Sequence, residues 1–192
     1  PLVRAVGFTG SFGAGRALFA LCAARPEPIP FFGELGSVNP MFVLPAAAAA
    51  RSDEIGTGWA GSLTMGAGQF CTNPGIAVVT DGPDADKLVA AAKAALEKVG
   101  PQTMLTDGIA QAYREGADRM NRSNAVQPVL TTESAARNAS PNLYETTTDA
   151  FLSEHQLGEE VFGPLGLVIR VKAVSYTHLT LADEGSSGDL GG

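Results

Sequence analysis

Cysteine and histidine are scarce, because the 192-residue sequence has only two of each. Two cysteines, Cys22 and Cys71, are too few for a disulfide framework. No secretory segment is recognisable, so we expect a reducing, cytoplasmic compartment. His155 and His178 are isolated from other ligand-type residues, and we therefore predict no metal site.

Positive charge is scarce as well. Charged residues make up 17% of the chain, the net charge is −7, and lysine and arginine form no cluster. This composition argues against a nucleic-acid partner. No apolar run approaches the length needed to cross a bilayer, so we expect no membrane partner either.

Apolar residues and glycines are abundant, with 45% hydrophobic residues and 23 glycines. The length allows one large domain or two small ones with a sizeable core. Short apolar runs alternate with segments of helical periodicity, which predicts an α/β fold with a largely parallel sheet. Strands are expected at residues 3–8, 29–32, 41–44, 76–80, 126–130 and 167–171, and helices at 12–24, 53–65, 84–99 and 107–120.

Two serines are placed to cap predicted helices, Ser11 before residues 12–24 and Ser52 before residues 53–65. A glycine-rich turn at residues 9–11 joins the first strand to the first helix. The amides of this turn and the positive end of the helix dipole could hold a phosphate. A tight turn that binds no ligand is the alternative.

Cys71 lies in a polar bend flanked by glycines, in the stretch Gly68-Gln69-Phe70-Cys71-Thr72-Asn73-Pro74-Gly75. Such an open backbone lets a substrate approach a thiol and lets amide groups hold an oxyanion. Most cysteines are small buried hydrophobic residues, and that interpretation stays open, as does a pairing of Cys71 with His155. Cys22, among apolar residues of a predicted helix, is expected in the core.

Glu34 has apolar and small neighbours, in the stretch Phe31-Phe32-Gly33-Glu34-Leu35-Gly36, which is not a surface pattern. A carboxylate in apolar surroundings suits general-base chemistry, although a buried glutamate that only accepts backbone hydrogen bonds is the alternative. A nucleophilic thiol together with a general base predicts an enzyme that forms and hydrolyses a thioester.

A third stretch, Glu159-Glu160-Val161-Phe162-Gly163-Pro164, places two carboxylates before a stiff turn. Adjacent carboxylates are usually solvated surface residues. Here the turn could also present one acid and one aromatic ring to a ligand.

These stretches together resemble the aldehyde dehydrogenase superfamily. The similarity lies in four motifs that occur in the family's order: Phe8-Thr9-Gly10-Ser11, Glu34-Leu35-Gly36 with Asn39-Pro40, Gly68-Gln69-Phe70-Cys71, and Glu159-Glu160-Val161-Phe162-Gly163-Pro164. Residues 34–40 and 68–75 are most similar to the 2-oxoglutarate semialdehyde (2,5-dioxovalerate) dehydrogenases. The NADP-dependent fatty aldehyde dehydrogenases have similar motifs and are the alternative.

The resemblance implies an NAD(P)-dependent oxidation of a small-molecule aldehyde to an acid, 2,5-dioxovalerate to 2-oxoglutarate in the full-length parent. Cys71 would attack the aldehyde, with the oxyanion held by its own amide, and Glu34 would activate the water that hydrolyses the thioester. The remaining implied site residues would bind NADP or NAD: Gly10, Ser11, Leu35, Glu160 and Phe162. Arg114, Arg119 and Arg122 are candidates to bind a substrate carboxylate.

The resemblance also implies an aldehyde dehydrogenase-like domain organisation. Residues 1–36 would be the end of a Rossmann-type dinucleotide-binding domain, and residues 37–174 most of an α/β catalytic domain. We interpret the chain as an internal fragment of a parent that is a homodimer or homotetramer, and we expect the fragment itself to be inactive. An inactive folded remnant that lacks half of the cofactor site is the alternative to the enzyme interpretation. Residues 175–192 are expected to be a non-native or disordered tail.

Overall fold

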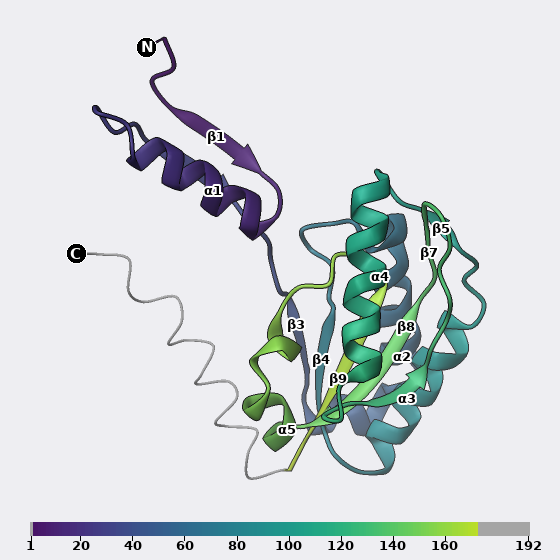
Figure 1. Ribbon diagram of the computed structural model, residues 1–192. Helices are drawn as coiled ribbons and strands as arrows, with labels where there is room; N and C mark the ends of the chain where they lie inside the picture. Colours follow the sequence, from purple (N-terminus) through teal and green to yellow (C-terminus); the bar gives the residue numbers. More distant parts are fainter. Residues whose placement is uncertain (1, 173–192) are drawn as a thin grey trace. The chain divides into compact units, whose positions relative to one another are not determined.

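The computed structural model describes residues 2–172 (Figure 1). These residues form two compact units, one that ends at Ser37 and one that begins at Val38. The predicted assignment of the two parts as dinucleotide-binding and catalytic stays a prediction. The predicted tail, 175–192 with His178, lies outside the described residues. No helix within residues 2–172 is long and apolar enough to span a membrane.

The first unit consists of strand β1 (Val6–Thr9), helix α1 (Phe12–Ala23) and strand β2 (Phe31–Glu34). The two strands are parallel, with Val6 opposite Phe31 and Thr9 opposite Glu34. The Ser11 side chain caps α1 by accepting from the Ala14 amide at 3.4 Å, which confirms the predicted cap. The predicted strands are shifted, because pairing rather than apolar character defines their ends.

The second unit is built on a five-stranded sheet in the order β3-β4-β9-β8-β6. Its strands are β3 (Pro40–Val43), β4 (Ile76–Thr80), β9 (Leu165–Val171), β8 (Asn142–Thr147) and β6 (Gln127–Leu130). All neighbouring pairs are parallel except β6 with β8. The predicted α/β fold with a largely parallel sheet is confirmed.

Helices cover both faces of this sheet (Figure 1). Helices α2 (Pro45–Thr64) and α3 (Pro83–Leu96) pack on one face, and α4 (Asp107–Arg122) and α5 (Thr148–Ser153) lie on the other. Side chains of β4 alternate between the two cores: Val78 joins the α4 side, whereas Ala77 and Val79 join the α2–α3 side. Short elements complete the unit: η1 (Met65–Gly68), β5 (Gln102–Thr103), β7 (Asn138–Ala139) and η2 (His155–Gly158).

One prediction about this unit is wrong, and one strand was missed. Ser52 does not cap a helix, because α2 already begins at Pro45 and the Ser52 hydroxyl donates to the Ala48 carbonyl inside it. A kink at Arg51, whose φ is −155°, separates the two parts of α2. Strand β8 was not predicted at all, although it lies inside the sheet. Four of its six residues are polar, and Asn142, Glu145 and Thr146 have side-chain partners from distant parts of the chain.

Candidate active site

Cys71 lies in a tight turn that follows α2 and η1. The Asn73 amide donates to the Phe70 carbonyl at 3.0 Å, so Cys71 and Thr72 form the corner of the turn. The Asn39 side chain crosses to this turn and donates to the Cys71 carbonyl at 2.7 Å. Cys71 is exposed and Cys22 is buried, which confirms the expected core position of Cys22.

Side-chain hydrogen bonds from Asn73 and Trp59 hold the turn in place. The Asn73 side chain donates to the carbonyls of Leu63 and Gly68, both at 3.0 Å. The Trp59 indole donates to the Pro74 carbonyl at 2.6 Å. Because three backbone carbonyls around the turn receive these bonds, the thiol sits on a backbone with little freedom to move.

The residues before Cys71 follow an unusual path. Gly66, Ala67 and Gly68 all have positive φ, at 56°, 58° and 67°. The Gln69 side chain spans this bend by donating to the Gly66 carbonyl at 3.0 Å and accepting from the Leu105 amide at 2.9 Å. Left-handed backbone at three successive residues re-aims the chain at the end of α2, so that Cys71 points to the surface.

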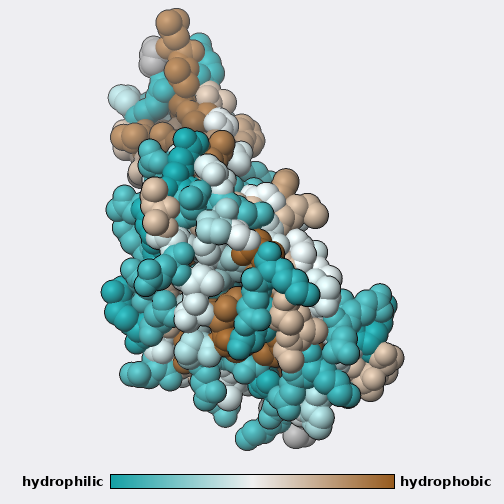
Figure 2. Space-filling model, turned by 90° about the vertical axis from the view of Figure 1, so that its right-hand side faces the viewer, coloured by the Kyte–Doolittle hydropathy of each residue, from teal (hydrophilic) through white to brown (hydrophobic). Residues whose placement is uncertain are grey.

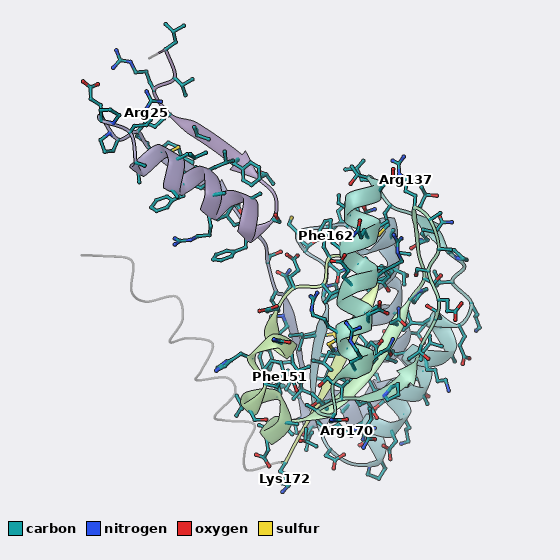
Figure 3. The ribbon with its side chains drawn as sticks, viewed as in Figure 1. Arg25, Arg137, Phe151, Phe162, Arg170 and Lys172 are labelled. Atoms are coloured by element: carbon teal, nitrogen blue, oxygen red, sulfur yellow. The ribbon has the colours of Figure 1, made fainter. Side chains whose placement is uncertain are left out.

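Gly68 brings two of the sequence motifs together. A Cβ on Gly68 would lie 2.3 Å from the Gly163 carbonyl carbon and 2.6 Å from the Pro164 nitrogen. Only glycine permits this approach of two backbones. Residues 68–75, which we call the cysteine turn, therefore contact the Phe162-Gly163-Pro164 turn directly, and the latter turn leads into β9. Phe162 is half-buried on that segment (Figure 3), and Glu160 is exposed.

The other predicted site residues belong to the first unit, where they also lie together. The Gly10 amide donates to the Glu34 carbonyl at 3.0 Å, so the glycine turn and the glutamate strand are adjacent. The Leu35 side chain packs where a Cβ on Gly15 would be, 2.0 Å from its Cδ2. The Gly10 amide is thus used inside the unit, and the first-turn amides of α1 after Ser11 are better placed for an anion.

The expected apolar surroundings of Glu34 are not found in the described residues. Glu34 is exposed at the end of β2, and so are its neighbours Phe32 and Gly33. A two-stranded sheet with a single helix has too few elements to enclose this carboxylate.

The substrate-arginine candidates lie on α4. Arg114 donates to the Ala136 carbonyl, and Arg119 and Arg122 are exposed near the end of the helix. His155 is exposed at the start of η2. Their roles stay predictions.

Two tyrosines, Tyr113 and Tyr144, are buried in the core of the second unit on the α4 side of the sheet. The sequence reasoning gave neither of them a role. Burial raises the pKa of Tyr113 well above its usual value, against the hydrogen bond from Asn142, which lowers it. Burial also raises the pKa of Tyr144 to about 12, and the charge of Asp118 adds to this. Helical spacing within α4 is consistent with the inward position of Tyr113, but it gives no signal for a polar partner of the hydroxyl.

Comparison with known proteins agrees with these motifs. The sequence model of the aldehyde dehydrogenase family matches residues 1–183, so the chain belongs to this family. The match includes the first residues of the segment from 175 onward for which a non-native origin is predicted.

Two curated relatives carry a more specific name. The chain is 47% identical over 174 residues to alpha-ketoglutaric semialdehyde dehydrogenase 2 of Azospirillum brasilense, covering 90% of this chain and 33% of the relative. It is 38% identical over 174 residues to alpha-ketoglutaric semialdehyde dehydrogenase of Acinetobacter baylyi, covering 89% of this chain and 33% of the relative. The chain thus spans about a third of the length of these relatives.

The fold is also that of solved enzymes. One is the NADP-dependent glyceraldehyde-3-phosphate dehydrogenase of Bacillus halodurans in complex with NADP, with a TM-score of 0.70 and 23% identity. That similarity covers 91% of this chain and 36% of the enzyme. It supports the aldehyde dehydrogenase-like α/β fold.

Proposed function

We propose that this chain supplies the catalytic thiol and general base of an NAD(P)-dependent aldehyde dehydrogenase that acts on 2-oxoglutarate semialdehyde. The observation that carries the proposal is the meeting of three motifs around one exposed cysteine. Asn39 bonds the Cys71 carbonyl, and Gly68 rests on the turn at Gly163. A rigid, exposed thiol on such a turn is the arrangement that covalent catalysis requires.

In the proposed reaction, the Cys71 thiolate attacks the aldehyde carbon, and the Cys71 amide donates to the oxygen that becomes negative. Loss of hydride from the resulting thiohemiacetal leaves a thioester on Cys71. Bound NAD(P) supplies the hydride acceptor for this step. Glu34 then takes a proton from water, the water oxygen attacks the thioester carbon, and the acid leaves as the thiolate is restored.

The cofactor proposal has support in the first unit. The first two amides of α1 have no acceptor within the helix, and Ser11 caps the helix beside them. A Cβ on Gly13 would meet no atom within 4 Å, so the surface there is open. These groups would hold a phosphate of NADP or NAD, with Gly10 and Leu35 lining the turn. Glu160 and Phe162, on the segment before β9, are proposed as further cofactor residues.

The substrate proposal rests on the names of the two curated relatives, both alpha-ketoglutaric semialdehyde dehydrogenases. A substrate with a carboxylate would suit an arginine in its site, and Arg114, Arg119 and Arg122 remain the candidates. We also propose a cytoplasmic homodimer or homotetramer for the full-length protein, which light scattering would measure.

The test places this chain in a full-length context. In a chimera, the matched segment of the Azospirillum brasilense relative is replaced by the corresponding residues of this chain. The chimera is expected to reduce NAD(P) with 2-oxoglutarate semialdehyde, and faster than with a long-chain aldehyde. Cys71→Ser should lower kcat by about a thousandfold or more, because the thiol forms the covalent bond.

Glu34→Gln separates the two halves of the reaction. It should leave a burst of one reduced cofactor per active site and then stop, because the thioester forms but is not hydrolysed. Cys22→Ser is the matched control and should keep kcat within about twofold, since Cys22 is buried in the first unit. Full turnover by the Cys71→Ser chimera would overturn the proposal, and steady turnover by Glu34→Gln would remove Glu34 from it.

A further inference from the structure

A buried polar pair, Tyr113 and Asn142, has no part in the proposed chemistry. Both side chains are 1% exposed. The Asn142 amide group donates to the Tyr113 hydroxyl at 2.9 Å, and that hydroxyl donates to the Ser140 carbonyl at 2.6 Å. The Asn142 side-chain oxygen accepts from the Thr132 amide at 2.9 Å. A fully bonded polar pair in a core has one preferred arrangement, because each broken bond leaves a buried group unsatisfied.

This pair contacts and hydrogen-bonds the turn at Phe162-Gly163-Pro164. The Tyr113 ring lies where a Cβ on Gly163 would be, 2.2 Å from ring atom Cδ2. The Asn142 backbone amide donates to the Pro164 carbonyl at 3.0 Å, and the Tyr113 hydroxyl is 3.3 Å from the same oxygen. Two residues before Gly163, the Val161 side chain fills the space beside Gly116 of α4.

The same segment supports the cysteine turn at both of its ends. At the start, Gly68 touches the backbone of Gly163 and Pro164. At the end, the Gly75 carbonyl accepts from the Leu167 amide at 2.9 Å. A shift of residues 163–167 would therefore move both ends of the turn that carries Cys71.

We propose that Tyr113 and Asn142 are positioning residues, which set the Gly163–Pro164 turn and through it the orientation of the Cys71 turn. The catalytic meaning of this positioning rests on the proposed function, whereas the mechanical coupling does not. Neither residue touches the reacting atoms. The hydroxyl of Tyr113 is the critical group for this role. A phenylalanine ring would fill the same space beside Gly163 but would make none of the hydroxyl's hydrogen bonds.

The chain contains a built-in reporter for the test. Trp59 is its only tryptophan, and the Trp59 indole is bonded to the Pro74 carbonyl at the end of the cysteine turn. Tyr113→Phe in the 192-residue chain removes the hydroxyl and keeps the ring. It is expected to shift the Trp59 emission spectrum and to change the alkylation rate of Cys71 about threefold to tenfold, equivalent to the loss of one buried hydrogen bond.

Tyr144→Phe is the matched control. Tyr144 is also fully buried, but its hydroxyl donates to the Asn121 side chain on α4 at 2.9 Å, whereas that of Tyr113 bonds the Gly163–Pro164 segment. This variant is expected to lose stability like Tyr113→Phe while leaving the Trp59 spectrum and the Cys71 rate unchanged. Equal responses of the two variants, or no response to Tyr113→Phe, would show a structural role only and overturn the proposal.

Asn142→Asp provides a second variant, since it keeps an oxygen for the Thr132 amide and removes the donor to Tyr113. It should shift the Trp59 spectrum in the same direction as Tyr113→Phe. Hydrogen exchange of the unmutated chain needs no variant: the amides of Asn73 and Asn142 should open together. Separate opening of these two amides would overturn the coupling.

Failure of this proposal and failure of the proposed function are distinguishable. Full turnover by the Cys71→Ser chimera would overturn the proposed function. The Trp59 spectrum and hydrogen exchange would still report whether Tyr113 and Asn142 hold the turn.

Discussion

The two units of this chain differ sharply in how they bury their apolar side chains. The second unit has a sheet covered on both faces, with large side chains such as Tyr144, Leu63 and Leu88 fully buried. In the first unit, Cys22 is buried, but Phe12, Leu21 and Phe32 are 66–68% exposed. Figure 2 shows brown, apolar residues on the surface of that unit.

This difference shows where rigidity for the proposed chemistry comes from. The proposed nucleophile Cys71 belongs to a unit with its own cores, whereas the proposed base Glu34 belongs to a unit of two strands and one helix. A two-stranded sheet is marginally stable without further packing. Contacts within the second unit therefore fix the backbone that carries Cys71. The first unit would have to bury more of its exposed apolar side chains before Glu34 was held as firmly.

The largest expected difference is in hydrogen exchange. Amides of β4, β8 and β9 should exchange at least about a thousandfold more slowly than those of β1 and β2, because opening a two-faced core exposes far more apolar surface. Exchange measured by mass spectrometry on the 192-residue chain would show this. Equal protection in the two sets of strands would contradict the comparison.

Glycine-to-alanine variants sharpen the comparison. Gly68→Ala should destabilise the second unit by about 2–4 kcal/mol, because φ is +67° and the new Cβ would collide with backbone atoms. Gly15→Ala in the first unit should change stability by less than about 1 kcal/mol, since the flexible Leu35 side chain can move and alanine favours the helix.

Urea unfolding followed by Trp59 fluorescence and by circular dichroism measures both variants. A Gly68→Ala chain as stable as the unmutated one would mean that the two motif backbones do not need their close approach.

The ion-pair network at the end of the sheet should have a smaller effect. Arg170, labelled in Figure 3, is half-buried and pairs with Glu145 at 2.6 Å, Asp86 at 2.8 Å and Asp81 at 3.1 Å. Burial alone would lower the pKa of Arg170, but hydrogen bonds to the three carboxylates raise it above its ordinary value. Arg170→Met should lower the free energy of unfolding by about 1–3 kcal/mol, because Glu145 loses its partner.

Lys87→Met is the control for this network, because Lys87 pairs with Asp84 at 3.1 Å on an exposed surface. It should change stability by less than about 1 kcal/mol. Urea unfolding at two salt concentrations would measure both variants. If Arg170→Met were no more harmful than the control, the network would add nothing to the second unit.

The smallest effect is expected at alkaline pH, again in the second unit alone. The pKa of Tyr144 is raised to about 12, above the value of about 10 in an unfolded chain. The folded state thus binds the tyrosine proton more tightly, so its contribution to stability is complete below about pH 10 and is lost as the pH rises toward 12.

Unfolding curves of the unmutated chain and of Tyr144→Phe between pH 9 and about 12 would test this titration. The variant should lose stability less steeply, because it has no proton to release at that position. Parallel curves would show that Tyr144 does not contribute to the alkaline slope.

Much of the fold could be predicted from local patterns. The apolar run at 76–80 and the helical spacing in 84–99 identified β4 and α3, because period and length distinguish strands from helices. Strand β8 was missed because Asn142, Glu145 and Thr146 interrupt its apolar pattern. Each of these polar side chains has a partner from another element, the Tyr113 hydroxyl, Arg170 and the Ala125 carbonyl.

The candidate site was predicted in its parts rather than as an assembly. The motifs identified Cys71, Glu34 and the turn at Phe162, whose catalytic and cofactor roles stay predictions. They did not indicate that Asn39 would bond the Cys71 carbonyl or that Gln69 would clamp the bend before it. Hydrogen bonds between residues far apart in sequence leave no periodic signal.

The sequence by itself determined the alternation of strands and helices, the Ser11 cap and the set of motifs that defines the family. Each depends on neighbours within a few residues, where steric preference and apolar spacing act directly. Only the tertiary structure decided that Gly68 contacts Gly163, and that Tyr113 and Asn142 pack against and bond the Gly163–Pro164 turn. Such contacts depend on how whole layers pack, and close packing is a property of the assembled core.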